Sequence, residues 1–337
     1  MIDDRDYAII LELQEDARQS DARIARKTGI SEASVRRRIS RMIRDGVIRI
    51  AAVTSPWKTG YNVPAFIGIC VELSRLEQVL KALTAMPRVH FIGTVAGRYD
   101  IVIWATFRSP QELAEFGKKD LAAVRGITRT EAMITLEITK REQKILSDNR
   151  SATGTGDRQT GPVEALGAEA ADPSPEAFDE RDYRLMVELQ RDARQSDAQV
   201  SRKLGISEAT VRRRIHRLIQ RGIISIAPVI TPYAVGYSTA AFIVLRCRLS
   251  SLDEVLERLS AMPRVHFVSL VTGRFDVLAW GTFRSPRELT KFIKRDLSAL
   301  PGVVSSETFI NLEICKRDLG LLPPRPAEHT EASRTSA

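Results

Sequence analysis

The stretch Ser31–Gly46, SEASVRRRISRMIRDG, recurs almost letter for letter as Ser207–Gly222, SEATVRRRIHRLIQRG. Its apolar residues recur every three or four positions, so a helix would place them on one face; they are Val35, Ile39, Met42 and Ile43. Ser31 is a favourable N-cap, because its hydroxyl can accept a hydrogen bond from a free N–H group of the first turn. Gly46 supplies a stop just past the end. Both stretches are therefore predicted to be amphipathic helices.

The side of this helix opposite the apolar stripe is strongly basic. Arginines along one face and small residues at the start suit the major groove of DNA, where arginine pairs with guanine or phosphate. For a single such helix the alternative is a solvated basic face. The residues expected to contact DNA are Ser34, Arg36, Arg37, Arg38, Arg41 and Arg44, and in the repeat Thr210, Arg212, Arg213, Arg214, Arg217 and Arg221.

Two groups of arginines are expected to differ in their contacts. Those expected to reach the groove or a phosphate are Arg37, Arg41, Arg213 and Arg217. Arg38 and Arg214 flank the apolar stripe, so they are expected to touch a phosphate or the neighbouring helix.

The residues upstream favour DNA binding over an ordinary basic helix. A first helix is predicted over residues 3–20, where Asp3 and Asp6 have the spacing of a capping box. A second short helix, residues 21–28, leads through the turn Gly29–Ile30 to the basic helix. Two helices joined by a short turn that carries glycine, the second of them basic, indicate a helix-turn-helix.

The chain contains the same module twice. Asp6 aligns with Asp182, and the same offset of 176 residues aligns Gly97 with Gly273 without insertion or deletion. The unit of about 140 residues is too long for a solenoid repeat, so we infer duplication of a complete two-domain protein.

Downstream of the basic helix the hydrophobic period changes to that of strands. A strand is predicted over residues 47–53; then come strands over 65–73, 89–96, 100–107 and 128–138 and helices over 76–85 and 109–124. This order, β-α-β-β-α-β, predicts a ferredoxin-like layer with both helices on one face. The other face should be covered by a partner sheet. The strand over 100–107 is apolar on both sides and should be central.

Composition separates these modules from two polar segments. The predicted division is a helix-turn-helix domain over 1–54, a ferredoxin-like domain over 61–142, a disordered linker over 147–177, the repeats over 178–230 and 237–318, and a disordered tail over 323–337. The linker and tail carry almost no large apolar residues, so they cannot bury enough surface to order themselves. A linker of this length lets the two copies pair within one chain.

Charge and cysteine content narrow the class of protein. The net charge of +9 fits a polyanionic partner. The chain has no apolar run long enough to cross a bilayer and an acidic N-terminus, so no membrane partner and a cytoplasmic, nucleoid-associated location are expected. Cys70, Cys247 and Cys315 form no CxxC pattern, which argues against a disulfide framework or a zinc cluster. No metal or cofactor is expected.

The order of these features resembles the Lrp/AsnC, or feast/famine, family of bacterial transcriptional regulators. The resemblance rests on the acidic-capped first helix, the V-R-R-R-I helix, the hinge, and a ferredoxin-like domain with G-R-Y-D at a hairpin. It implies an α+β fold with two winged-helix-type helix-turn-helix domains and two ferredoxin-like RAM domains that dimerise sheet to sheet. It also implies double-stranded DNA as a partner and no enzymatic activity.

In this family a small effector, usually an amino acid, sits at RAM interfaces near the hairpin. The positions that match are Gly97, Arg98, Tyr99 and Asp100, and in the second copy Gly273, Arg274, Phe275 and Asp276. Backbone N–H groups and an arginine can hold a carboxylate, and an aspartate can hold an ammonium group. The alternative is that both glycines only serve the turn and the charges are solvated.

The chain departs from the family in carrying two modules. We infer that one chain forms an intramolecular pseudo-dimer, and several chains could form a higher homo-oligomer. The outward positions of the two basic helices differ: Ser34, Ser40, Arg44 and Asp45 become Thr210, His216, Gln220 and Arg221. A homodimer reads a symmetric site, whereas a fused pair need not. We therefore predict an imperfectly palindromic target.

Two rival functions fit parts of this sequence. Some siroheme decarboxylases resemble these regulators in architecture, and His90 and His266, in matched MPRVHF blocks, could act as acid, base or haem contact. A histidine at an interface or edge strand is the plainer explanation. A metabolite-sensing scaffold without DNA binding would have lost basic character in one of the helices. Both helices keep their arginines, which favours the regulator.

Overall fold

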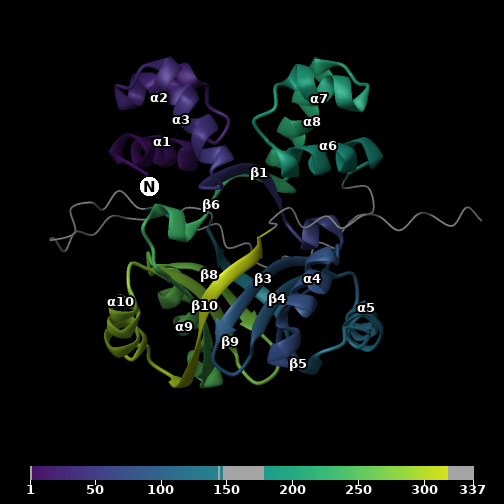
Figure 1. Cartoon of the computed structure of the whole chain (residues 1–337), viewed down its shortest axis with the longest axis vertical. Helices are drawn as coiled ribbons and strands as arrows, with labels where there is room; N and C mark the ends of the chain where they lie inside the picture. Colours follow the sequence, from purple (N-terminus) through teal and green to yellow (C-terminus); the bar gives the residue numbers. More distant parts are fainter. Residues whose placement is uncertain (1, 143–144, 147–177, 318–337) are drawn as a thin grey trace, which may run out of the picture.

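The computed structural model describes residues 2–142, 145–146 and 178–317. Two helix-turn-helix lobes stand above a closed β-barrel that carries helices on its outside (Figure 1). The predicted linker over 147–177 and tail over 323–337 fall outside the described residues. Among the described helices none is both long and apolar enough to cross a membrane.

Each lobe has three helices followed by one strand. In the first copy these are α1 Asp4–Glu15, α2 Asp21–Thr28, α3 Glu32–Arg44 and β1 Ile48–Thr54. In the second they are α6 Glu180–Arg191, α7 Asp197–Leu204, α8 Glu208–Gln220 and β6 Ile224–Ile230. The predicted capping box is confirmed, because the Asp3 and Asp6 carboxylates each accept the other's backbone N–H. The helix-turn-helix prediction is confirmed in both copies.

Three details of the prediction were wrong. The first helix ends at Glu15 and not at residue 20, because Asp16 is extended and its carboxylate accepts the N–H of Arg18. Ile43 is 40% exposed, so only Val35, Ile39 and Met42 form the buried stripe of α3. Ser31 occupies the N-cap, but its hydroxyl forms no capping bond, whereas Ser207 accepts from the N–H of Thr210. The backbone position thus defines the cap in both copies.

The second part of each copy has the predicted βαββαβ order. Its elements are β2 Val63–Val71, α4 Leu76–Ala85, β3 Val89–Ala96, β4 Ile101–Phe107, α5 Pro110–Glu115 and β5 Ile127–Arg141, and in the second copy β7 Thr239–Cys247, α9 Leu252–Ser260, β8 Val265–Val271, β9 Val277–Phe283, α10 Pro286–Lys291 and β10 Val303–Arg317. A π-helical turn extends α5 to Leu121, three residues short of the predicted end at Val124. The matching turn after α10 ends at Leu297.

The eight strands close into one barrel in the order β10-β3-β4-β2-β5-β8-β9-β7. Two seams join the copies, one between β5 and β8 and one between β10 and β3. The expectation that each apolar face finds a partner sheet is therefore confirmed. Inside the barrel, the Phe66 ring packs edge-on against Phe242 of the other copy at 5.7 Å between centroids.

Strand β4 shows why the sheets must pair. All seven of its residues are buried. Val102 and Trp104 face the barrel interior, whereas Ile101 and Ile103 pack under the helices. The prediction of a central strand covered on both faces is confirmed.

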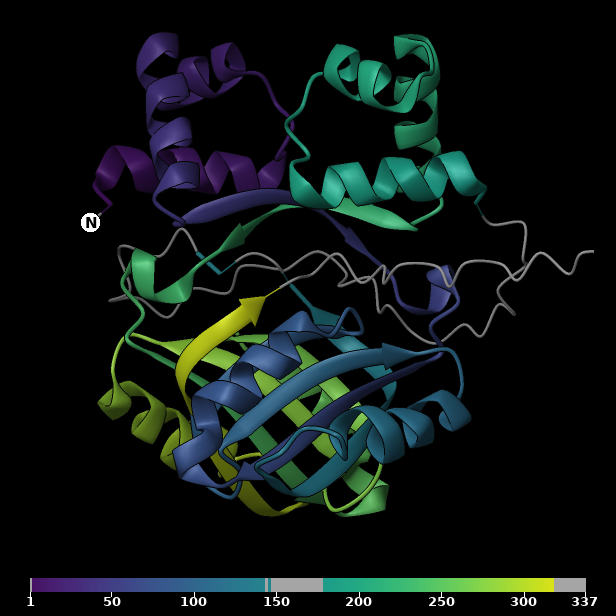
Figure 2. The same cartoon turned by 45° about the vertical axis from the view of Figure 1, so that its right-hand side comes forward.

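The sequence did not reveal how the two lobes are joined. Strand β1 pairs antiparallel with β6 over its whole length, from Ile48 opposite Ile230 to Thr54 opposite Ile224. Each strand thus finds its partner in the other copy. This two-stranded ribbon lies under both lobes and above the barrel (Figure 2), so it fixes one helix-turn-helix relative to the other.

Candidate DNA-binding surface and effector sites

The two basic helices, α3 and α8, each lie within their own lobe, on the far side of the ribbon from the barrel (Figure 1). Val35, Ile39 and Met42 anchor α3 in the core of its lobe, and this burial turns the arginine face outward. Arg37 and Arg213 are exposed, and neither forms an ion pair with a residue in the described ranges. These two side chains are therefore available to a polyanion.

A buried carboxylate orients each basic helix. Asp6 on α1 is fully buried; it accepts hydrogen bonds from Arg38 at 2.8 Å and from Arg41. The N–H of Asp6, followed by the Arg38 guanidinium, lowers the pKa of the neighbouring Asp3 to about 2. Arg38 therefore touches the neighbouring helix, one of the two contacts expected for it, while Arg41 keeps 40% of its side chain exposed.

The second copy repeats this arrangement at matched positions. Asp182 is fully buried and accepts hydrogen bonds from Arg214 at 2.8 Å and from Arg217. A buried carboxylate that receives two guanidinium groups is compensated, and removing either partner would leave a buried charge. The two basic helices are thus held to their first helices by the same contacts.

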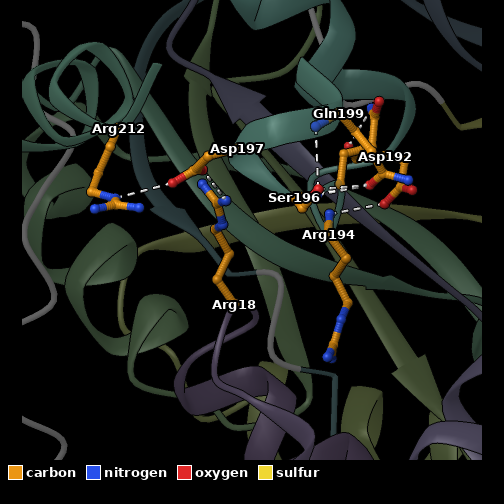
Figure 3. A network of polar contacts seen from close by, with 8 residues as sticks. Arg18, Asp192, Arg194, Ser196, Asp197, Gln199 and Arg212 are labelled. Carbon is orange, nitrogen blue, oxygen red and sulfur yellow. Dashed lines mark hydrogen bonds and ion pairs between the residues drawn. The ribbon is translucent and has the colours of Figure 1, made fainter. Parts of the chain in front are cut away.

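A second carboxylate in each lobe links the copies. Asp197 accepts from Arg18 of the first copy and from Arg212 on α8, each at 3.1 Å (Figure 3). The mirrored bridge joins Asp21 to Arg194 of the second copy at 2.7 Å and to Arg36 at 3.2 Å. Two residues predicted to contact DNA, Arg36 and Arg212, therefore pair with the same aspartates that link the two lobes.

The remaining predicted DNA contacts lie at the ends of the basic helices. Ser34 and Thr210 are half-buried in the first turns, and the Thr210 hydroxyl pairs with that of Ser207 at 2.9 Å. At the other end, Arg44 pairs with the adjacent Asp45 at 3.2 Å. The backbone carbonyl of Arg221 accepts from Lys58 at 2.9 Å.

The predicted effector residues lie in the β3–β4 and β8–β9 hairpins. Several of their side chains already bind other groups of this chain. The Asp100 carboxylate accepts the N–H of Val71 at 2.8 Å, and Asp276 accepts the N–H of Cys247 at 2.7 Å. Gly97 has a φ of 145°, a conformation that favours glycine. Its counterpart Gly273 has a φ of 106°. The glycines therefore serve the turns, and the aspartates tie each hairpin to the adjoining strand.

The aromatic residues of the two hairpins are buried, and the two hairpin arginines approach the same carboxylate. Burial, aided by a hydrogen bond from its hydroxyl to Glu131, raises the pKa of Tyr99. Phe275, its counterpart, is also buried. Arg98 makes a two-pronged ion pair with Glu307 of the other copy at 2.9 and 3.0 Å, and this guanidinium lowers the pKa of Glu307. The Arg274 guanidinium lies 3.6 Å from the same carboxylate.

A large cavity lies on the outside of the second copy, away from the turns of both hairpins. It has a volume of about 890 Å³ and lies between the ends of α9 and α10. An adjoining cavity of about 430 Å³ shares part of its lining. Their charged lining comprises six cations and two carboxylates: Arg258, Arg264, Arg284, Arg287, Lys291, Arg295, Glu288 and Asp296.

The matched positions of the first copy are electrically balanced. They hold three cations and three carboxylates, with two uncharged residues: Ala82, Arg88, Arg108, Gln111, Glu115, Lys119, Glu112 and Asp120. This set of positions is therefore basic in the second copy only.

Both histidines of the rival hypothesis are buried at the seams of the barrel. His90 Nε2 lies 2.9 Å from the Thr106 hydroxyl, and His266 Nε2 lies 2.7 Å from that of Thr282. Each ring also packs against a tryptophan, Trp104 or Trp280. His266 additionally lines the large cavity. Each ring contacts a threonine and a tryptophan of its own copy, which fits the edge-strand explanation.

Three features of these sites were not predicted from the sequence. These are the bridging aspartates Asp21 and Asp197, the shared carboxylate Glu307, and a pair of arginines, Arg141 and Arg317, at the mouth of the barrel. The only signal for the arginines was a Lys-Arg pair at matched positions in the two copies.

Comparisons with known proteins agree with this architecture. The Lrp/AsnC ligand-binding domain matches residues 64–145 and 240–321. A winged helix-turn-helix DNA-binding model matches residues 2–49, and the AsnC-type helix-turn-helix domain matches 178–219. The chain belongs to the Lrp/AsnC family of helix-turn-helix transcriptional regulators.

Individual relatives match one module of the chain. An uncharacterized HTH-type transcriptional regulator of Pyrococcus abyssi is 41% identical over 140 residues, which are 41% of this chain and 89% of the relative. Another from Pyrococcus horikoshii is 38% identical over 140 residues, with the same coverage. Among solved structures, the siroheme decarboxylase NirDL covers 93% of both chains with a TM-score of 0.59 and 14% identity. That likeness shows a shared fold alone.

Proposed function

We propose that this protein is a sequence-specific regulator that places α3 and α8 on double-stranded DNA and responds to an amino acid or a related small metabolite. The observation that carries the proposal is the pair of outward basic helices held at a fixed separation. The β1–β6 ribbon and the Asp21 and Asp197 bridges set that separation. A fixed pair of helices suits two half-sites at defined spacing on the duplex.

The arginines divide into roles according to their contacts. Arg37 and Arg213, which have no carboxylate partner among the described residues, are proposed to reach bases or phosphates. Arg41 and Arg217 keep an exposed side while pairing with Asp6 and Asp182, which suits a phosphate contact. The other predicted positions are proposed to flank these contacts: Ser34, Arg36, Arg38, Arg44, Thr210, Arg212, Arg214 and Arg221.

The effector is proposed to act at the hairpins. Arg98 already holds a carboxylate, Glu307 of the other copy, so an amino acid that binds there must displace Glu307. That exchange would loosen one contact between the copies, and the effector would favour the arrangement that it binds better. A panel of standard amino acids tested by calorimetry should give one binder. Absence of any binder, or equal binding after Arg98→Ala, would count against the hairpin.

The domain division given above and a cytoplasmic, nucleoid-associated location are part of this proposal. So is assembly of several pseudo-dimers into a higher homo-oligomer, which sedimentation of the full chain tests. A single species with the mass of one chain would contradict it.

The deciding experiment is a footprint on the DNA upstream of the protein's own gene, at low and at physiological salt. Two protected segments on one face of the duplex, about one helical turn or a multiple apart, are expected. The double variant Arg37→Ala/Arg213→Ala should lose both segments while its thermal unfolding stays unchanged. Diffuse protection that disappears with salt would show phosphate binding without sequence preference and would sink the proposal.

One observation favours a second candidate function. The basic cavity of the second copy has the size of a cofactor site and includes His266. A siroheme-decarboxylase-like enzyme would place a tetrapyrrole carrying several carboxylates there. Titration with an iron tetrapyrrole, followed by its absorption, tests this candidate. A saturable spectral change that is lost in His266→Ala would favour the enzyme, and an unchanged spectrum would remove it.

A further inference from the structure

Two arginines close the mouth of the barrel that faces the β1–β6 ribbon. Arg141 is the last residue of β5, and Arg317 is the last residue of β10, the matched position in the other copy. The Arg141 guanidinium lies 5.2 Å above the Trp104 ring, and that of Arg317 lies 5.1 Å above Trp280. Both guanidiniums line one cavity of about 70 Å³ at the seam between the copies.

The hydrogen bonds at this mouth leave its positive charge uncompensated. Arg141 donates through Nη1 to the carbonyl of Thr54 at 2.9 Å, but its Nη2 is buried and has no hydrogen-bond partner among the described residues. Arg317 donates through Nη1 to the carbonyl of Ile230 at 2.5 Å. Within the described ranges neither guanidinium forms an ion pair with a carboxylate.

The nearest acidic group is already engaged, and another cation is close. Glu142 also lines the cavity, but its carboxylate pairs with Lys140 at 3.3 Å. Arg49 donates to the backbone carbonyl of Arg317 at 3.1 Å. The site thus gathers more positive than negative charge.

Each arginine as a whole is half-buried, but its guanidinium group has lost water, and this loss has an electrostatic cost. Loss of water around the guanidinium lowers the pKa of Arg141 to about 10. The same loss of water, followed by the charge of Arg49, lowers the pKa of Arg317 to about 10. Both side chains still carry their charge at neutral pH, and buried cations are normally matched by an anion. Stacking on tryptophan attracts a cation but does not supply the negative charge.

We propose that the cavity between Arg141 and Arg317 binds one small carboxylate. Guanidinium groups match the planar pair of carboxylate oxygens, and the free Nη2 of Arg141 supplies a donor for one of them. The volume of about 70 Å³ holds roughly five water molecules, so it accommodates an anion of the size of acetate. The rest of the wall, apart from Glu142, is aromatic and suits a methyl-sized apolar part; it is formed by Phe66, Phe91, Trp104, Phe242, His266, Phe267 and Trp280.

This site is separate from the turns of the two hairpins, which hold the predicted effector residues, and connects the barrel to the DNA-binding lobes. The carbonyls held by Arg141 and Arg317 belong to Thr54 and Ile230, the last residues of β1 and β6. An anion that pulls the two guanidiniums together would therefore act on the ribbon that carries both lobes. This coupling to DNA rests on the proposed function, whereas anion binding does not.

The tryptophans provide a direct measurement. The chain has three tryptophans, and two of them, Trp104 and Trp280, lie in this cavity. With Trp57→Phe as the background, the full chain is titrated with sodium acetate at constant ionic strength. A saturable change in tryptophan emission is expected, with a rise in Tm over the same concentration range. A linear change without saturation and no rise in Tm would overturn the proposal.

Variants at the arginines show whether the cavity is responsible. Arg141→Met and Arg317→Met keep the length of the side chain and remove the charge, so each should weaken acetate binding at least tenfold. Without acetate these variants should unfold at the same temperature as the parent or above it, since an uncompensated buried charge has been removed. Arg125→Met, at an exposed position just before the opposite end of β5, removes a positive charge outside this cavity and should keep the full response.

Two outcomes distinguish a failure of the anion site from a failure of its coupling to DNA binding. An unchanged acetate affinity in both methionine variants would overturn the binding site, whatever the DNA result. Saturable binding that leaves DNA affinity the same with and without acetate would overturn the coupling and leave the site standing. If the protein does not bind DNA at all, only the proposed function fails, because the fluorescence titration contains no DNA.

Discussion

The helices α3 and α8 differ in their outward side chains while their inward contacts agree. Arg38 and Arg214 lie at the same 2.8 Å from Asp6 and Asp182. Outward, three residues change class: Ser40, Arg44 and Asp45 become His216, Gln220 and Arg221. The duplicated module has therefore retained the contacts that orient each helix and has altered the side chains that would face DNA.

The outer surfaces of the two ferredoxin-like layers differ in the same way. The second copy surrounds its cavity with six cations and two carboxylates, and the first copy has three of each at the matched positions. The seams between the copies, in contrast, use the same strands on both sides. Fusion lets one surface change without a matching change in the other, which a homodimer cannot do.

Removal of the buried carboxylate should have the largest effect. Asp6→Ala removes the buried partner of Arg38, which keeps its ion pair with the more exposed Asp3, so the first lobe should lose about 3 kcal/mol, the lower end of the range for a broken buried pair, and Asp182→Ala should do the same to the second. Hydrogen exchange of the lobe amides measures each loss separately. Asp45→Ala, at an exposed position, serves as the control. Very unequal losses would show that the two inward networks are not equivalent, despite their matching distances.

Much of this arrangement follows from local sequence, because its causes are local. The capping box at Asp3 and Asp6, the apolar spacing of Val35 and Ile39, and the order of the strands all depend on neighbours within a few residues. Ile43 was placed on the apolar stripe but is 40% exposed, because it lies at the edge of the stripe, where the helical period cannot decide burial. The end of the first helix was misplaced because Asp16 competes for the backbone with its own side chain.

Contacts between residues far apart in the sequence could not be predicted from local patterns. Strand β1 finds its partner β6 in the other copy, and no local pattern identifies a partner so distant along the chain. The G-R-Y-D hairpin was predicted from resemblance, yet its Asp100 holds a backbone N–H and its Arg98 holds Glu307. Whether a ligand binds there stays a prediction. Arg141 and Arg317 become a pair only when the barrel closes.

The outward arginines should show the next largest effect. Arg37→Ala or Arg213→Ala should weaken binding to the preferred DNA by about 1–3 kcal/mol if that side chain reads a base. If it holds a phosphate, all sequences should weaken alike and the salt dependence should become shallower. Titrations against the preferred and a scrambled duplex distinguish the two. A loss at one position with none at the other would show that only one helix engages the groove.

The divergent outward residues should have a smaller effect. The double variant His216→Ser/Gln220→Arg restores two residues of α3 on α8 and should reduce the difference in affinity between the two half-sites by about 1 kcal/mol, the lower end of what a single base contact contributes. Competition between two symmetrised duplexes, each built from one half-site, measures that difference. The reverse exchange on α3, Ser40→His/Arg44→Gln, should change the other half-site. If neither exchange alters the preference, the asymmetry of these helices is not read.

The bridge between the lobes should have the smallest effect on stability. Arg18 and Asp197 keep 27% and 17% of their side chains exposed, so water screens part of their attraction. A double-mutant cycle with Arg18→Ala and Asp197→Ala should give a coupling of about 1 kcal/mol or less. The mirrored pair, Arg194 and Asp21, is shorter by 0.4 Å, 2.7 against 3.1 Å, and should couple at least as strongly.

The same cycle can also be run on DNA affinity. Asp197 holds both Arg18 and Arg212, so its removal frees a predicted DNA contact while loosening the lobes. If the ribbon alone fixes the separation of α3 and α8, Asp197→Ala should strengthen DNA binding. The reason is that Arg212 would no longer pair with a carboxylate and could bind a phosphate instead. If the bridges are needed to hold that separation, the variant should weaken binding to the two-half-site duplex and leave a single half-site unaffected. The sign of the change therefore shows which contact between the copies holds the two helices in register.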